Sequence, residues 1–181
     1  MVDIETLGTR PGSVILSVGA CAFSSEGIGA TFYRAIDLFD SLVTRGLSID
    51  PQTVAWWRTQ PDEARHAAAP IEGTTSLHNA LHAFATFVTD ADAPYLWAKG
   101  PDFDLVLLAE AYHACGLPVP WSFRHTRDVR TIAALVRDRL PVAANTKKHH
   151  ALHDAIHQAN VVLACYATLG LDIDAPPEPR A

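Results

Sequence analysis

The alternation of apolar and polar positions predicts three strands in the first part of the chain. A short strand ends near Glu5, a near-continuous apolar strand covers residues 13–23, and a third strand covers residues 31–36. The connections are short and rich in turn residues, with Pro11-Gly12 before the second strand and Ser-Ser-Glu-Gly after it. We therefore expect an antiparallel meander.

Helical periodicity dominates the remainder of the chain. Pro51 suits the first position of a helix, and Ser76 is a suitable N-cap for a helix whose apolar residues recur at steps of four, three and four. The pattern predicts helices over residues 53–59, 61–69, 77–89, 103–115, 131–139 and 150–169. Two further short strands, over residues 95–98 and near residues 123–129, alternate with the later helices.

This order of elements is typical of the α/β class, with a mixed sheet flanked by helices. The 181 residues, of which 49% are hydrophobic, correspond to one domain with a sizeable core. We expect one domain over residues 1–171, followed by a flexible proline-rich tail over residues 172–181.

The overall charge gives no sign of a nucleic-acid partner. The chain has 14 Lys and Arg against 20 Asp and Glu, a net charge of −6, and so lacks the basic excess that grips a phosphate backbone. No apolar stretch approaches the roughly 20 residues that cross a bilayer, so no membrane association is expected.

The N-terminus and the cysteines favour a cytoplasmic protein. The first residues are acidic, where a secretory signal would be basic and then apolar. Cys21, Cys115 and Cys165 are widely spaced and form no Cys-x-x-Cys pair, so we expect small core side chains in a reducing compartment.

Acidic residues in three distant segments form the candidate chemistry. Asp3 and Glu5 are two apart on a predicted strand and leave the same face, Asp102 and Asp104 lie at the start of a predicted helix, where either could serve, and Asp154 lies among histidines at the start of the last helix. Each alone has an ordinary explanation as a solvated strand end, a helix cap or a polar helix start. Together they supply the hard oxygen ligands that a magnesium site requires. His149 adds a group suited to taking a proton from water.

These segments resemble the DEDDh 3′-5′ exonucleases of the ribonuclease H-like superfamily. Asp3-Ile4-Glu5-Thr6 matches the first motif of that group, Phe103-Asp104 the second, and His149-x-Ala151-Leu152-x-Asp154 the third. Further matches in the Thr53–Trp57, Trp97–Asp104 and Arg127–Thr131 segments are most similar to the small bacterial, mycobacterial and phage (DexA-type) 3′-5′ exoribonucleases.

The resemblance implies a ribonuclease H-like fold with a five-stranded mixed sheet, three antiparallel strands and then parallel ones. It implies that Asp3, Glu5, Asp104 and Asp154 hold two Mg²⁺ ions, for which Mn²⁺ substitutes, and that His149 is the general base. The implied reaction removes 5′-mononucleotides from the 3′ end of single-stranded nucleic acid or of 3′ overhangs, with RNA preferred. Relatives are often dimers, which makes a homodimer one expected assembly.

Residues near the motifs are candidates for binding the substrate. By the resemblance, Thr6 and Leu7 hold the terminal nucleotide. Trp56 and Trp57 lie about 100° apart on a helix, so one packs while the other faces a groove, and Trp57 is the candidate for base contact. Lys99 and Lys148 are candidates for phosphate contact.

Three alternatives compete with an exoribonuclease. The first is a 3′-5′ exodeoxyribonuclease on the same scaffold. The second is a zinc hydrolase that uses His149, His153 and His157, which recur at four-residue steps. The third is an inactive nucleic-acid-binding module, against which the presence of all five motif residues argues.

The charge balance predicts that binding of nucleic acid depends on the metal. Two divalent ions add four positive charges, which changes the net charge from −6 to −2. Fluorescence anisotropy with a labelled single-stranded oligonucleotide should show weak binding in EDTA and tighter binding with divalent ions, using Ca²⁺ beside Mg²⁺. Equal affinity in EDTA and in metal would contradict the prediction.

Overall fold

The computed structural model describes residues 1–136, 142, 144–145 and 147–175, and it has the expected mixed α/β organisation. Strands β1 (Val2–Thr6), β2 (Ile15–Ser24) and β3 (Gly27–Ala35) form an antiparallel sheet in the order β1-β2-β3. Strands β4 (Leu96–Ala98) and β5 (Thr126–Asp128) pair in parallel. The expected antiparallel meander is confirmed.

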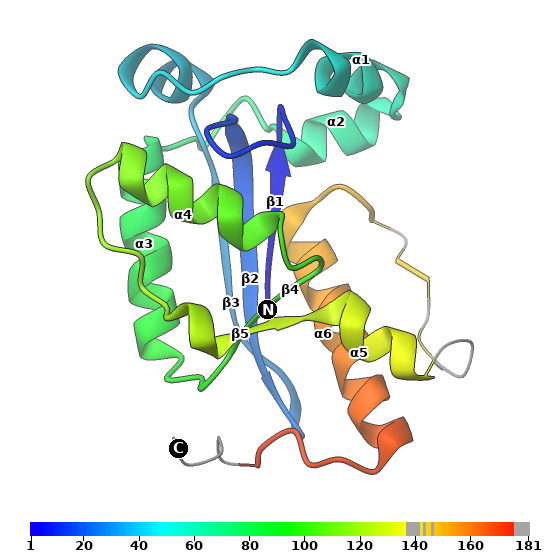
Figure 1. Cartoon of the computed structure of the whole chain (residues 1–181). Helices are drawn as coiled ribbons and strands as arrows, with labels where there is room; N and C mark the ends of the chain where they lie inside the picture. The colour runs from blue at the N-terminus through cyan, green and yellow to red at the C-terminus, as the bar shows by residue number, and fades with distance from the viewer. Residues whose placement is uncertain (137–141, 143, 146, 176–181) are drawn as a thin grey trace.

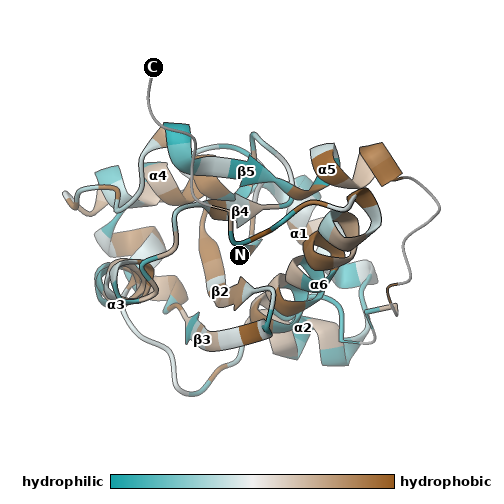
Figure 2. Ribbon diagram, turned by 90° about the horizontal axis from the view of Figure 1, so that it is seen from below, coloured by the Kyte–Doolittle hydropathy of each residue, from teal (hydrophilic) through white to brown (hydrophobic). Residues whose placement is uncertain are grey.

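Helices cover both faces of the three-stranded sheet. The helical segments are η1, one π-helical turn (Asp40–Thr44), α1 (Pro51–Thr59), α2 (Asp62–Ala68), α3 (Leu77–Asp90), α4 (Asp104–Ala114), the 3-10 turn η2 (Phe123–His125), α5 (Val129–Val136) and α6 (Ala151–Leu169). Figure 1 shows α3 and α4 on one side of the sheet, α5 and α6 on the other, and α1 and α2 across one end. The view along the strands in Figure 2 shows α3 and α6 on opposite sides of β2 and β3.

The five strands are joined by hydrogen bonds as sheets of three and two strands. β1 lies against β4, but within the described residues no ladder connects them. β4 has only three residues, and the Ile4 N–H donates to Oδ1 of Asp104 at 3.2 Å instead of to a strand. The Ile4 N–H at the edge of β1 therefore has a side-chain acceptor.

Several boundaries differ from the sequence-based expectation. β3 begins at Gly27, four residues early, because the hairpin turn is tighter than expected. The strand predicted near residues 123–129 is split into η2 and β5, and the helix predicted to begin at residue 131 begins at Val129. The end of that helix, residues 137–139, and most of the predicted tail, residues 176–181, lie outside the described residues. The η1 turn was not predicted.

The core has two parts, one on each side of the sheet. Phe84 of α3 and Leu108 of α4 pack with Val18 on one side, and Val162 of α6 packs with Trp97 on the other. Burial raises the pKa of all three cysteine thiols, and none of them is in a disulfide. Among the described residues, no helix is long and apolar enough to span a membrane.

The contact between α6 and β2 is unusually close because of Gly19. A Cβ atom at this glycine would lie 2.1 Å from the Leu152 nitrogen and 2.2 Å from the Ala151 carbonyl carbon. The α6 residues on this face are small, with Ala151, Ala155 and Ala159 fully buried. Gly19 pairs with Asp3 across the β1–β2 ladder, so the two residues face α6 side by side. This approach brings the start of α6 to the first predicted catalytic acid.

Replacing Gly19 with alanine should therefore displace α6. Because the clash is with backbone atoms, we expect the Gly19→Ala variant to lose about 3 kcal/mol or more of unfolding free energy. The matched control is Gly29→Ala, where a Cβ would make only ordinary contacts at 3.7 Å and beyond. Urea denaturation measures both variants, and equal stabilities would contradict the close-approach argument.

Candidate active site

Three carboxylates from the two ends of the chain meet at the junction of β1 and α6. Asp3 and Glu5 leave the same face of β1, and Asp154 lies in the first turn of α6. One carboxylate oxygen from each residue lies within 4.8 Å of the other two. Of all acidic, histidine and cysteine side chains in the described part of the chain, only these form such a group.

Asp104 lies beside this group and completes an acidic cleft. It is the first residue of α4, is 2% exposed, and uses one oxygen to accept the Ile4 N–H. The cleft has a volume of about 200 Å³. Its lining consists of Asp3, Ile4, Glu5, Lys99, Phe103, Asp104, Arg130, His149, Asp154 and Gln158.

The segment before α6 is tied to Asp154. Asn145 Nδ2 donates to one carboxylate oxygen at 2.7 Å, and the backbone N–H groups of His149 and His150 donate to the other at 2.7 and 3.2 Å. His149 has a left-handed backbone with φ 65°. This conformation turns the backbone so that the His149 ring lines the cleft immediately before the helix begins. The acid therefore fixes the position of the histidine through the backbone.

Gln158 supports the acidic cluster from α6. It follows Asp154 by four residues, so both lie on one helix face, and its Nε2 donates to Asp3 Oδ1 at 2.7 Å. Its Oε1 is buried and has no hydrogen-bond partner. A buried acceptor without a donor, next to several carboxylates, matches the surroundings of a cation.

Burial and mutual repulsion hold protons on the acids when no metal is present. Burial, with repulsion from Asp104, Glu5 and Asp154, raises the pKa of Asp3 well above its usual range. Burial and neighbouring acids raise the pKa of Glu5 to about 8. Burial raises the pKa of Asp104 to about 7, although the Ile4 N–H and the Arg130 charge act in the opposite direction.

The donor set fits hard divalent cations. All ligand atoms in the group are carboxylate oxygens, which Mg²⁺ and Mn²⁺ accept, and a cation favours the ionised form that burial and repulsion disfavour. Asp3, Glu5 and Asp154 are the side chains able to hold it, with Asp104 nearby.

A second cavity, of about 450 Å³, opens next to the carboxylates. Glu5 and Phe103 line both spaces, and Thr6, Trp56 and Trp57 line the second one. Trp57 is 7% exposed, and its Nε1 donates to the Thr6 carbonyl at 2.8 Å. Trp56 is 44% exposed. Trp57, the residue predicted to contact a base, is therefore the packed tryptophan, and Trp56 is the one that faces the groove.

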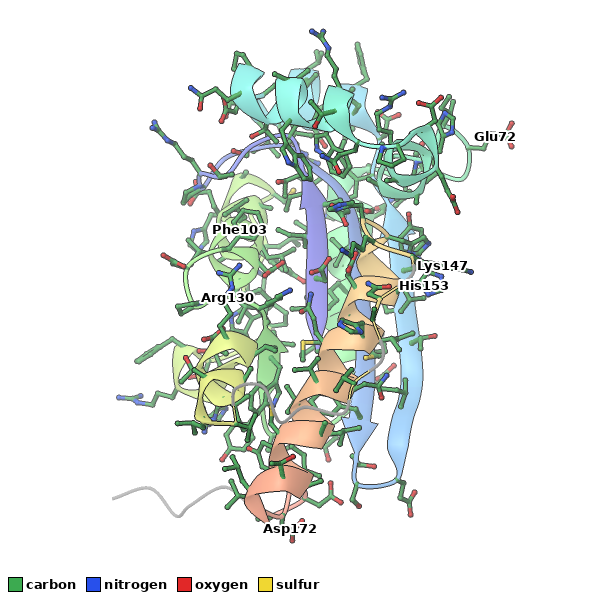
Figure 3. All side chains as sticks on the ribbon, turned by 90° about the vertical axis from the view of Figure 1, so that its right-hand side faces the viewer. Glu72, Phe103, Arg130, Lys147, His153 and Asp172 are labelled. Atoms are coloured by element: carbon green, nitrogen blue, oxygen red, sulfur yellow. The ribbon has the colours of Figure 1, made fainter. Side chains whose placement is uncertain are left out.

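The other predicted binding residues occupy different places. The Leu7 side chain packs on the core and lines neither cavity. Lys99 lines the acidic cleft, whereas Lys148 lines a depression of about 620 Å³ that shares His149. Figure 3 shows Phe103 and Arg130 on one side of β1, and Lys147 and His153 on the other. Cationic groups therefore flank the acidic cleft on two sides.

The predicted zinc site, with His149, His153 and His157 on one face of a helix, is wrong. His149 precedes α6 and has a left-handed backbone, so it does not share a helix face with His153 and His157. Its ring instead contacts Trp56 and Trp57 edge-on, with centroids 5.3 and 5.5 Å apart. His153 contacts His150.

Sequence reasoning missed several residues of the cleft. Gln158 had a signal, because its four-residue spacing from Asp154 places it on the same helix face. Arg130 belongs to the Arg127–Thr131 segment that contributed to the family resemblance, but its position in the cleft depends on how the chain folds. Asn145, which donates to Asp154 from outside the cleft lining, had no signal that separated it from ordinary polar residues.

The raised pKa values predict that the metal-free protein loses stability as the pH rises. The folded protein retains protons on Asp3, Glu5 and Asp104 that the unfolded chain releases above pH 5, so raising the pH favours unfolding. We expect the unfolding free energy in EDTA to fall by roughly 2 to 4 kcal/mol between pH 5.5 and pH 8. The buried Met1 amine, with its pKa lowered to about 6, opposes this trend as a single group.

Asp3→Asn is the matched variant for this measurement. Asparagine retains the acceptor for Gln158 and removes one buried ionisable group, so the metal-free variant should be more stable than wild type at pH 8 by about 1 to 2 kcal/mol. Saturating Mg²⁺ should abolish the fall in wild type. Wild-type stability that is constant or rises with pH in EDTA would show that the pKa values of these acids are not raised in the folded protein.

Comparisons with known proteins identify the family of the chain. Residues 1–166 match the model of the 3′-5′ exoribonuclease Rv2179c-like domain. The chain is also 25% identical, over 218 aligned positions, to the exodeoxyribonuclease of Enterobacteria phage T4, an alignment that covers 98% of this chain and 93% of the phage protein. The chain therefore belongs to the Rv2179c-like 3′-5′ exoribonuclease family, and it is an exonuclease, a hydrolase that acts on nucleic acids.

Proposed function

We propose that the protein hydrolyses the 3′-terminal phosphodiester of single-stranded RNA, or of 3′ overhangs, with two divalent metal ions. The observation that carries this proposal is the meeting of Asp3, Glu5 and Asp154, with ligand oxygens within 4.8 Å, in one cleft with His149. In the proposed reaction, water attacks phosphorus, the P–O3′ bond to the penultimate nucleoside breaks, and a 5′-mononucleotide leaves.

The four acids would hold the ions in this proposal. Asp3, Glu5 and Asp154 would bind them directly, and Asp104, at the start of α4, would support them from the same cleft. When bound, Mg²⁺ stabilises the charge that develops on the attacking and leaving oxygens. Gln158 and Asn145 orient Asp3 and Asp154 through hydrogen bonds of 2.7 Å.

His149 takes the proton from the attacking water. Its position in the cleft and the anchoring of its backbone to Asp154 support this role. The edge contacts with Trp56 and Trp57 limit the orientations of the ring. A general base held in this way contributes on the order of 10²- to 10⁴-fold to the rate.

The neighbouring cavity receives the terminal nucleoside. Trp56 offers an exposed ring face for the base, while Trp57 and Thr6 form a fixed wall. Lys99 and Lys148 contact phosphates on the two sides of the cleft. The family description supports RNA as the substrate. The name of the phage relative supports DNA as the alternative on the same scaffold.

We also propose that the strands follow the ribonuclease H-like arrangement. In that arrangement β4 and β5 continue the sheet beyond β1. The element order and the contact between β1 and β4 support this interpretation.

A time course on RNA and DNA of one sequence, labelled at the 5′ end, tests the function. In Mg²⁺ the wild type should produce a ladder that shortens from the 3′ end, faster on RNA. His149→Ala should lower the rate on the order of 10²- to 10⁴-fold, and Asp3→Ala at least as much.

His157→Ala and Asp90→Ala are matched controls that should retain the wild-type rate, because His157 is outside the cleft and Asp90 is exposed at the end of α3. Substrate that does not shorten from the 3′ end would refute the proposal. Faster shortening of DNA than of RNA would favour the alternative.

A further inference from the structure

Arg130 places a guanidinium at the acidic cleft. It lies in the first turn of α5 and lines the cleft with Lys99 and Asp104. Its charge is close enough to lower the pKa of Asp104. Figure 3 shows Arg130 on the same side of β1 as Phe103, a residue that lines both the cleft and the nucleoside cavity.

The guanidinium of Arg130 forms no hydrogen bond and no ion pair within 4.0 Å in the described part of the chain. Only its backbone N–H is hydrogen-bonded, to Asp128 at 3.2 Å. The ion pairs within 4.0 Å that the described residues form are Arg65 with Asp62 and His113 with Glu110. An arginine beside four acids would ordinarily pair with one of them. Arg130 instead keeps its donors available toward the cleft.

Local backbone contacts fix the path of this side chain. Asp128, the last residue of β5, accepts the Gly100 N–H at 2.7 Å and the Thr131 N–H at 2.8 Å, which joins the loop after β4 to the start of α5. Gly100 has φ 124°, and a Cβ there would lie 3.0 Å from Arg130 Nη1. The missing side chain of Gly100 leaves the space through which Arg130 reaches the cleft.

We infer that Arg130 binds the non-bridging oxygens of the scissile phosphate, an inference that rests on the proposed exonuclease function. The planar guanidinium matches two phosphate oxygens, and a phosphate between it and the metal-binding acids would give it the partner it lacks. Arg130 then holds the phosphate from the side opposite Asp154. The donors are in place before the substrate arrives, which is the arrangement that lowers the barrier of a charged transition state.

Arg130→Gln, Arg130→Lys and Arg124→Gln test this role. Arg124 loses the same charge, but its guanidinium lies over the Phe123 ring and away from the cleft. The substrates are a dinucleoside monophosphate, which has one phosphodiester and no other phosphate, and a longer RNA. Arg130→Gln should lower kcat/KM about 10- to 100-fold on both substrates. Arg130→Lys should recover part of the loss, and Arg124→Gln should match wild type.

Binding of the product provides a readout independent of turnover. In Mg²⁺, Arg130→Gln should weaken calorimetric binding of a 5′-mononucleotide about 10-fold and leave binding of the corresponding nucleoside unchanged. Equal weakening of both ligands would indicate a structural defect and overturn the inference. A loss on the longer RNA alone would also overturn it, because Arg130 would then contact an upstream phosphate.

The two proposals fail separately. If wild type does not shorten RNA or DNA from the 3′ end, the proposed function fails. If wild type is active and Arg130→Gln retains full activity and full mononucleotide affinity, only the role of Arg130 fails.

Discussion

The close approach of α6 to β2 at Gly19 is the constraint on which the acidic cleft depends. Asp3 and Asp154 are separated by nearly the whole chain, and they meet because the start of α6 lies almost on the sheet backbone. The ladder places Gly19 directly beside Asp3, and small residues on α6 keep the helix close along its first turns. A longer side chain in this row would separate the two halves of the cleft. Packing and chemistry are therefore set by the same few positions.

The acidic cluster shows a conflict between folding and function. Buried carboxylates oppose folding: burial raises the pKa of Asp104 to about 7, and burial together with neighbouring acids raises the pKa of Glu5 to about 8. The surrounding structure offsets part of this cost through directed hydrogen bonds, from Gln158 to Asp3 and from three N–H donors to Asp154. Those bonds orient the carboxylates without neutralising them. The cluster is thus compatible with folding and keeps carboxylate oxygens that could hold a cation.

Much of this architecture is encoded in local patterns that the sequence displays. Strand alternation placed Asp3 and Glu5 on one face, and helical periodicity located α3, α4 and α6 within one or two residues. Long-range geometry was not accessible in the same way. The burial of Trp57 and exposure of Trp56 depend on how α1 docks against Thr6, and the left-handed backbone of His149 breaks the four-residue spacing that suggested a helical histidine site. Arg130 reaches the cleft because Gly100, in the loop after β4, has no side chain to block it.

The bond between the Ile4 N–H and Asp104 has a consequence for the edge of the sheet. An open strand edge can pair with another chain, and here a carboxylate occupies the donor. Ile4 is buried, so removing that acceptor would leave its amide without a partner, at a cost of about 1 to 3 kcal/mol. Asp104 is thus both an acid of the cleft and the acceptor for a buried backbone amide of β1. A variant at this position would lose stability as well as a charge, and loss of activity in it would not report on chemistry alone.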